Sequence, residues 1–153
     1  MRIKGFDLQE ETILEVGKFA ILWNWFERTY CGNNCNPAKI KNIAKYISIA
    51  PDAQACFVGV LNKRRHWFGQ REIAYVQESL HPGNARVSNE SDMCVMRQYL
   101  EQTGDESTRG CLLILQRIRN NLMHGMKIPE ELDGQIELFR AANAVLENIH
   151  EQY

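Results

Sequence analysis

Apolar residues recur every three or four positions along most of this chain, and this spacing places them on one face of an α-helix. No segment alternates apolar and polar residues convincingly over the length of a β-strand. The sequence therefore predicts an all-α protein. Because 153 residues is the size of one domain, we expect a single helical domain over residues 1–153.

Turn-forming residues and helix-capping signals divide this pattern into separate helices. The tract 67–89 is loop-rich and receives no assignment. The chain thus predicts long helices near both ends and short extra helices in the middle. The predicted helices cover residues 8–30, 38–49 and 52–66, a segment that closes at Gly104, a segment from Asp105 to Gly125, and a last segment opened by Pro129.

The first predicted helix is apolar nearly all round. Such a helix is either central in a bundle or shared with a second subunit, and the sequence leaves both possibilities open. Its main stripe is formed by Ile13, Val16, Ala20 and Trp23, widened by Phe19, Leu22 and Phe26, while Ile21 and Trp25 lie off it.

The formal net charge of −1 argues against a protein that coats nucleic acid by bulk electrostatics, which requires many Lys and Arg contacts to phosphates. A local basic site remains compatible with this charge. The N-terminal stretch lacks the apolar core of a signal peptide, and no later run reaches the length of a membrane span. We therefore expect a soluble, cytoplasmic protein without a membrane partner.

Five cysteines are scattered through the chain, an odd number without a secretion signal, so the sequence predicts reduced thiols. Cys31 and Cys35 alone lie close together, in CGNNC, at a spacing compatible with two zinc ligands. No second Cys or His pair follows at zinc-finger spacing. The sequence therefore predicts neither a metal site nor a cofactor.

The segment RIRNNLMHG, residues 117–125, carries more polar chemistry than a helix end requires. Successive residues turn a helix by about 100°, which puts Arg119 at the border of the apolar stripe and Arg117, Asn120 and His124 opposite it. The buried stripe is predicted to contain Cys111, Leu115, Ile118 and Leu122.

On a regular helix, the side chains of Arg119 and His124 leave the axis roughly 140° apart. Two arrangements bring them to one phosphate. The last turn unwinds before Gly125, or the polar face meets its symmetric copy in a homodimer and pools two arginines with two histidines. We favour the homodimer because the first helix also has spare apolar surface.

These residue types suit phosphodiester cleavage without a metal ion. A guanidinium matches the geometry of phosphate, and an imidazole titrates in the range where proton transfer is useful. Asn120, four residues before His124, is placed to orient the imidazole or to hold a phosphate oxygen. A plainer interpretation is a capped helix end, in which Arg and His meet the helix dipole ahead of Gly125.

The segment RNNLMHG resembles the signature of the HEPN superfamily, an Arg followed by a polar residue, usually Asn, and then a His after four to six intervening positions. LWNWFERTY in the first helix and GQIELFRAANAVLE after the motif are also similar to HEPN proteins of the Apea-like and plasmid-borne kinds. The likeness covers the first helix and the chain from about Thr108 onward.

This resemblance implies an up-and-down helical bundle that forms a homodimer and, in many members, a metal-independent endoribonuclease. Such members often serve as toxins or phage-defence effectors, restrained by an antitoxin or another regulatory protein. Arg119 would stabilise the scissile phosphate, His124 would move protons, and Asn120 matches the polar position. One group of these toxins carries a Tyr two residues after the His, where this chain has Met126, so neutralisation by modification of that Tyr is not expected.

Further candidate site residues lie outside the motif. Glu27 is expected either to support Arg119 or to reach solvent. Arg64, Arg65 and Trp67, in NKRRHW, and Arg117 are candidates for RNA contact, although basic residues at a helix end are usually solvated. The alternative to a nuclease is a catalytically inactive HEPN module that binds RNA, nucleotide or a protein partner.

Overall fold

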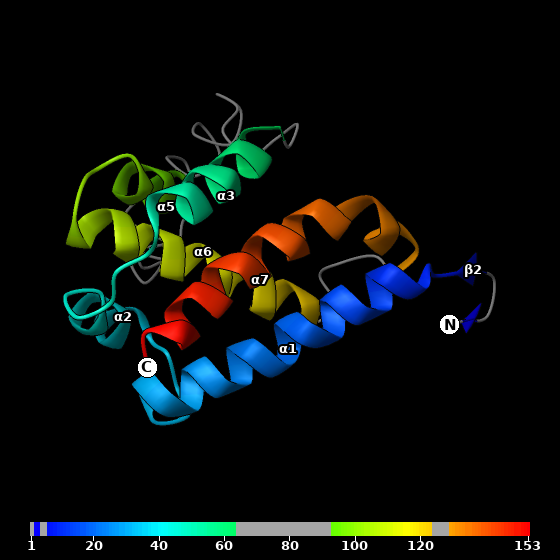
Figure 1. The fold of residues 1–153 in the computed structure, drawn as a ribbon, viewed down its shortest axis with the longest axis horizontal. Helices are drawn as coiled ribbons and strands as arrows, with labels where there is room; N and C mark the ends of the chain where they lie inside the picture. The colour runs from blue at the N-terminus through cyan, green and yellow to red at the C-terminus, as the bar shows by residue number, and fades with distance from the viewer. Residues whose placement is uncertain (1, 4–5, 64–92, 124–128) are drawn as a thin grey trace, which may run out of the picture.

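The computed structural model describes residues 2–3, 6–63, 93–123 and 129–153, which form a helical protein with one small antiparallel β-pair (Figure 1). The predicted all-α class is confirmed. None of the described helices has both the length and the apolar character needed to cross a membrane. In chain order the elements are β1 (Arg2–Ile3), β2 (Phe6–Asp7), α1 (Glu10–Cys31), α2 (Pro37–Ile43), α3 (Pro51–Lys63), α5 (Met93–Leu100), α6 (Asp105–Met123), the 3₁₀ helix η3 (Pro129–Gln135) and α7 (Ile136–Glu151).

The first half of α6 lies at the centre of the described core. Every residue from Ser107 to Leu115 is buried. Helices α5 and α2 pack against α6, and Gln54 of α3 donates a hydrogen bond to the hydroxyl of Ser107. Since α6 is enclosed on several sides, it is the central helix among the described elements.

Helix α1 presents an apolar face to this core and exposes two large apolar side chains on its outer side. Phe19, Trp23 and Phe26 are buried, whereas Leu14 is 65% and Ile21 is 72% exposed. Ala20, which we placed on the buried stripe, is exposed because the buried face is centred on the three aromatic residues. Large apolar side chains therefore lie on both sides of the helix, but charged residues share the outer side, and α1 is not central among the described residues.

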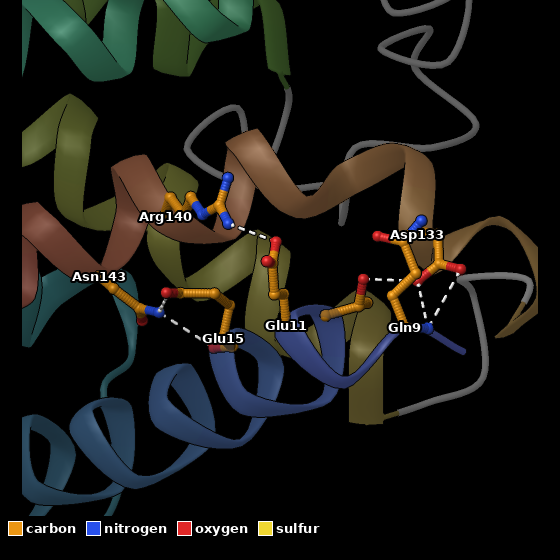
Figure 2. Close-up of polar contacts among 7 residues, drawn as sticks. Gln9, Glu11, Glu15, Asp133, Arg140 and Asn143 are labelled. Carbon is orange, nitrogen blue, oxygen red and sulfur yellow. Dashed lines mark hydrogen bonds and ion pairs between the residues drawn. The ribbon is translucent and has the colours of Figure 1, made fainter. Parts of the chain in front are cut away.

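Helices α1 and α7 run in the same direction and end together near the C-terminus, with α7 lying between α1 and α3 (Figure 1). Polar pairs cross the α1–α7 contact at regular intervals, and Figure 2 shows two of them. The parallel alignment follows from these pairs, because both partners advance along their helices together. The pairs are Glu11 with Arg140, Glu15 with Asn143, and Lys18 with Glu147.

The predicted helix over 38–49 ends early in the structure, at Ile43. Its last residues form a non-helical connection to α3, in which the amide of Ala50 donates to the Asn148 side chain over 2.8 Å. Proline at position 51 disfavours helical geometry only in residue 50, so it separates the connection from α3 but does not by itself end α2 at Ile43. The apolar residues that suggested a longer helix are instead buried in the connection between α2 and α3.

The last predicted helix begins as η3, and regular α-helix starts only at Ile136. The spacing of three or four residues along this segment predicts one buried stripe, made of Leu132, Ile136, Phe139, Asn143, Leu146, Ile149 and Tyr153. The structure buries these residues from Leu132 to Ile149 except Ile136, which is half-buried, whereas Tyr153 is 79% exposed. Because α7 ends at Glu151, this tyrosine lies beyond the helical register that buries the others.

Asp133 of η3 caps the start of α1, which has no cap of its own. The side chain of Gln9, at the N-cap position, makes no capping bond. The Asp133 carboxylate instead accepts hydrogen bonds from the Gln9 amide at 3.0 Å and from the Thr12 hydroxyl (Figure 2). A residue 124 positions away in sequence therefore satisfies one of the orphan backbone donors of this helix end.

Replacing Asp133 with Ala is expected to lower the free energy of unfolding by about 1–2 kcal/mol, the usual cost of losing a helix cap. Urea denaturation followed by circular dichroism measures this change. Glu131→Ala, two residues away on the same 3₁₀ helix and exposed, is the matched control. Equal stability of the two variants would contradict the capping role.

Candidate functional site

The polar end of α6 follows the pattern expected from its helical periodicity except at Asn120. Ile118 is buried, Arg117 is exposed and Arg119 is half-buried, which confirms that Arg119 lies at the border of the apolar stripe. Asn120, which we placed opposite the stripe, is also half-buried, because its side chain contacts Arg119. The other stripe residues Cys111 and Leu115 are fully buried, and Leu122 is half-buried.

Arg119 and Asn120 contact each other directly. The Nη1 atom of Arg119 donates a hydrogen bond to the Oδ1 atom of Asn120 over 3.1 Å. This bond uses one of the five N–H donors of the guanidinium and limits the positions that the long arginine side chain can adopt. Arg119 therefore places a permanent positive charge at the border of the apolar stripe, and Asn120 holds the guanidinium in position.

Several predicted site residues lie outside the residues that the structure describes. These are His124, which comes one residue after the last residue of α6, and Arg64, Arg65 and Trp67. The predicted approach of His124 to Arg119 and the predicted RNA contacts stay predictions, as does the loop-rich character of 67–89.

The carboxylate of Glu27 bonds to Cys35, whereas the sequence left open either support of Arg119 or contact with solvent. Its carboxylate accepts a hydrogen bond from the Cys35 amide over 3.4 Å, and its carbonyl oxygen accepts from the amides of Gly32 and Asn33. Between Glu27 and Arg119, both of which are described, the structure shows no ion pair. Glu27 thus organises the turn that follows α1.

Cys31 and Cys35 form a disulfide bond, so the prediction that all the cysteines are reduced thiols is wrong for this pair. The turn after α1 places their Cα atoms 5.0 Å apart, within the range that a disulfide spans. That turn depends on left-handed backbone at Gly32 and Asn33, which have φ of 59° and 77°. The number of cysteines and the expected cellular compartment do not reveal that this turn brings Cys31 and Cys35 together.

Gln116 is a contact residue that the sequence did not reveal. Its Nε2 atom donates a hydrogen bond to the carbonyl oxygen of Cys35, 81 positions away. Gln116 precedes Arg119 by three residues, so the two lie on adjacent turns of α6. The only signal in the sequence was the close spacing of the two cysteines, which we compared with a zinc pair.

A cavity of about 830 Å³ opens at the other end of α6. Its walls come from the α2–α3 connection, from α3 and from the turn between α5 and α6, and they include Gln54, Gly104 and Ser107. Thr108, the wall residue of α6 nearest in sequence to Arg119, precedes it by 11 residues, which is about 16.5 Å along the helix at a rise of 1.5 Å per residue. The cavity and the Arg119 site are therefore separate features.

Comparisons of the chain with protein-family models, with curated proteins and with solved structures gave no match.

Proposed function

We propose that this protein is a metal-independent endoribonuclease of the HEPN type that cleaves RNA through Arg119 and His124. The observation that carries the proposal is the half-buried Arg119 at the end of the central helix, held by its hydrogen bond to Asn120. The sequence RNNLMHG around it supplies the remaining groups that the reaction requires.

Each motif residue has a defined task in this reaction. The guanidinium of Arg119 binds the scissile phosphate and stabilises the negative charge that builds on its oxygens. The imidazole of His124 moves protons at the 2′-hydroxyl or at the leaving oxygen, since an imidazole can both accept and donate a proton. Asn120 fixes the guanidinium in place, and exposed Arg117 contributes a further contact to RNA phosphates.

The proposed active form is a homodimer in which the two motif segments share one cleft. Support comes from α1, whose outward face exposes the large apolar side chains of Leu14 and Ile21. These residues are seven positions apart, two helical turns, and therefore lie on one side of the helix. A second copy of α1 is the simplest partner for such a face.

The biological role that fits an RNA-cleaving enzyme of this type is a toxin or phage-defence effector restrained by a regulatory protein.

RNA cleavage measured in the presence of EDTA tests this proposal. We expect the wild type to cut RNA, and Arg119→Ala and His124→Ala each to lower the cleavage rate about 100-fold or more, because each removes a charge-stabilising or proton-transfer group. Arg140→Ala is the matched control: this exposed arginine pairs with Glu11 on another surface, so its loss should leave cleavage unchanged.

Circular dichroism and light scattering on the same samples confirm that each variant is folded and report its dimer content. A wild type that binds RNA without cutting it would point to the catalytically inactive HEPN module. Cleavage that is equally fast in the wild type and in both motif variants would exclude the assigned residues.

A further inference from the structure

The disulfide at the end of α1 closes a turn that is held from two sides. Inside the turn, the Cys35 amide donates to the Glu27 carboxylate, and Lys39 Nζ donates to the Cys31 carbonyl oxygen over 3.0 Å. Both cysteines are buried, with exposed fractions of 3% and 0%. The residues between them, 32–34, are exposed. The turn therefore has a buried covalent base and an exposed tip.

The same turn is attached to α6. The carbonyl oxygen of Cys35 accepts the hydrogen bond from Gln116, and Gln116 lies one turn before Arg119. Cys35 thus joins α1 to α6 through its backbone: its amide bonds to Glu27 and its carbonyl bonds to Gln116. A change in the position of Cys35 acts on the helix turn next to Arg119.

We call this connection of α1 to α6 through Glu27, Cys35 and Gln116 the joint, and the disulfide contributes to its geometry. Asn33 has a φ of 77°, which is a left-handed conformation. For any residue other than Gly this conformation has a cost in free energy, and it persists where the surroundings enforce it. The bond between Cys31 and Cys35 is one of the constraints that enforce it. Without the bond, we expect the turn to sample other backbone conformations, in which the Cys35 carbonyl moves away from Gln116.

Other described cysteines are poorly suited to take part. Burial raises the pKa of the Cys111 thiol to about 12, so this thiol stays protonated and unreactive inside α6. Cys56 is free and exposed on α3, a helix that does not contribute to the joint.

We propose that Cys31–Cys35 is a redox modification site that controls the end of α6 through Gln116, with low-molecular-weight thiols and dithiols as its reductants. The coupling between the disulfide and α6 does not depend on the proposed function. Only a resulting change in RNA cleavage at Arg119 rests on that function. In the oxidised protein the joint holds α6 around Arg119, and in the reduced protein that end of the helix opens more often.

The reaction is ordinary thiol–disulfide exchange. Because both sulfur atoms are buried, exchange follows local opening of the turn. A thiolate of the reductant attacks one sulfur, the S–S bond breaks, and the other cysteine leaves as a thiolate that takes up a proton. A second reductant thiolate then attacks the mixed disulfide, so the protein gains two electrons and two protons and the reductant becomes a disulfide.

Alkylation of the denatured protein first establishes the state of the pair. The oxidised chain should show three reactive thiols, and the chain treated with dithiothreitol should show all five. If the untreated chain shows five thiols even after oxidised glutathione is added, the pair does not form and the proposal is wrong.

Hydrogen–deuterium exchange of the full-length protein then tests the coupling. Upon reduction we expect exchange of α6 residues 116–123 to rise about fivefold, the change that follows from losing one ordinary hydrogen bond. The C31S/C35S double variant should match the reduced wild type under both conditions. In Gln116→Ala the disulfide should still form, but reduction should no longer change exchange in α6.

Cys56→Ser, which removes an exposed and unpaired cysteine, is the control and should respond like the wild type. Unchanged exchange in α6 upon reduction of the wild type would overturn the coupling, whether or not the protein cuts RNA. Exchange that changes in a protein without nuclease activity would support the redox joint and refute the proposed function, so the two failures are distinguishable.

Discussion

Replacing Gly110 with Ala is expected to destabilise the protein by about 3 kcal/mol, because the site has no room for a Cβ atom. An added Cβ would lie 2.5 Å from the backbone nitrogen of Leu100 and 2.8 Å from the carbonyl oxygen of Met96. Both atoms belong to the backbone of α5, so α5 and α6 must move apart. Thermal and urea unfolding of the purified variant measure the loss.

Gly59→Ala is the matched control, since a Cβ at this position on α3 meets nothing within 4 Å. There the usual preference of helices for Ala over Gly should raise stability by about 1 kcal/mol. Opposite signs for the two substitutions would identify close helix packing as the reason for Gly110. A Gly110→Ala variant as stable as the wild type would show that α5 does not approach α6 this closely.

Phe139→Ala is expected to cost about 4 kcal/mol, near the middle of the range for truncating a buried Phe. Phe139 of α7 and Phe19 of α1 are both fully buried, and their rings meet edge to face with centroids 5.6 Å apart. The substitution removes this contact and leaves a cavity between the two parallel helices. Chemical denaturation gives the free energy of unfolding.

Tyr46→Ala serves as the comparison, because this aromatic side chain is 86% exposed. Its removal should change stability by less than about 0.5 kcal/mol, as surface substitutions usually do. A double-mutant cycle with Phe19→Ala extends the test: a large coupling energy between positions 19 and 139 is expected only if α1 and α7 pack as described. Additive effects would place the two rings apart.

The helices themselves were predictable from the sequence, and their mutual arrangement was not. Apolar spacing indicated the burial of Phe19, Trp23 and Phe26 in α1 and of Ile118 in α6. The spacing contains no information on which helices pair, because the α1–α7 contacts join residues about 128 positions apart. The early end of α2 was not predictable either, because the connection that follows it is held by a hydrogen bond from the Ala50 amide to the side chain of a distant residue, Asn148.

The candidate site was predictable to a similar extent. Helical geometry placed Arg119 at the edge of the apolar stripe, where it is half-buried as expected. The contacts of Glu27 and Gln116 with Cys35 were not predictable, because they depend on how the turn after α1 folds back toward α6. The sequence placed Arg119 on α6 but did not identify the connection of this helix to the disulfide.

The polar pairs between α1 and α7 have a consequence for folding specificity. Two apolar helix faces can slide past one another by a turn at little cost, but these pairs permit one register. A shift of α7 by four residues would place Glu147 opposite Glu15, where Asn143 now donates hydrogen bonds to the carboxylate and carbonyl of Glu15. A shift in the other direction would set Phe139 against the same carboxylate. The pairs therefore contribute less to stability than to specificity, because they disfavour misaligned packings of the same two helices.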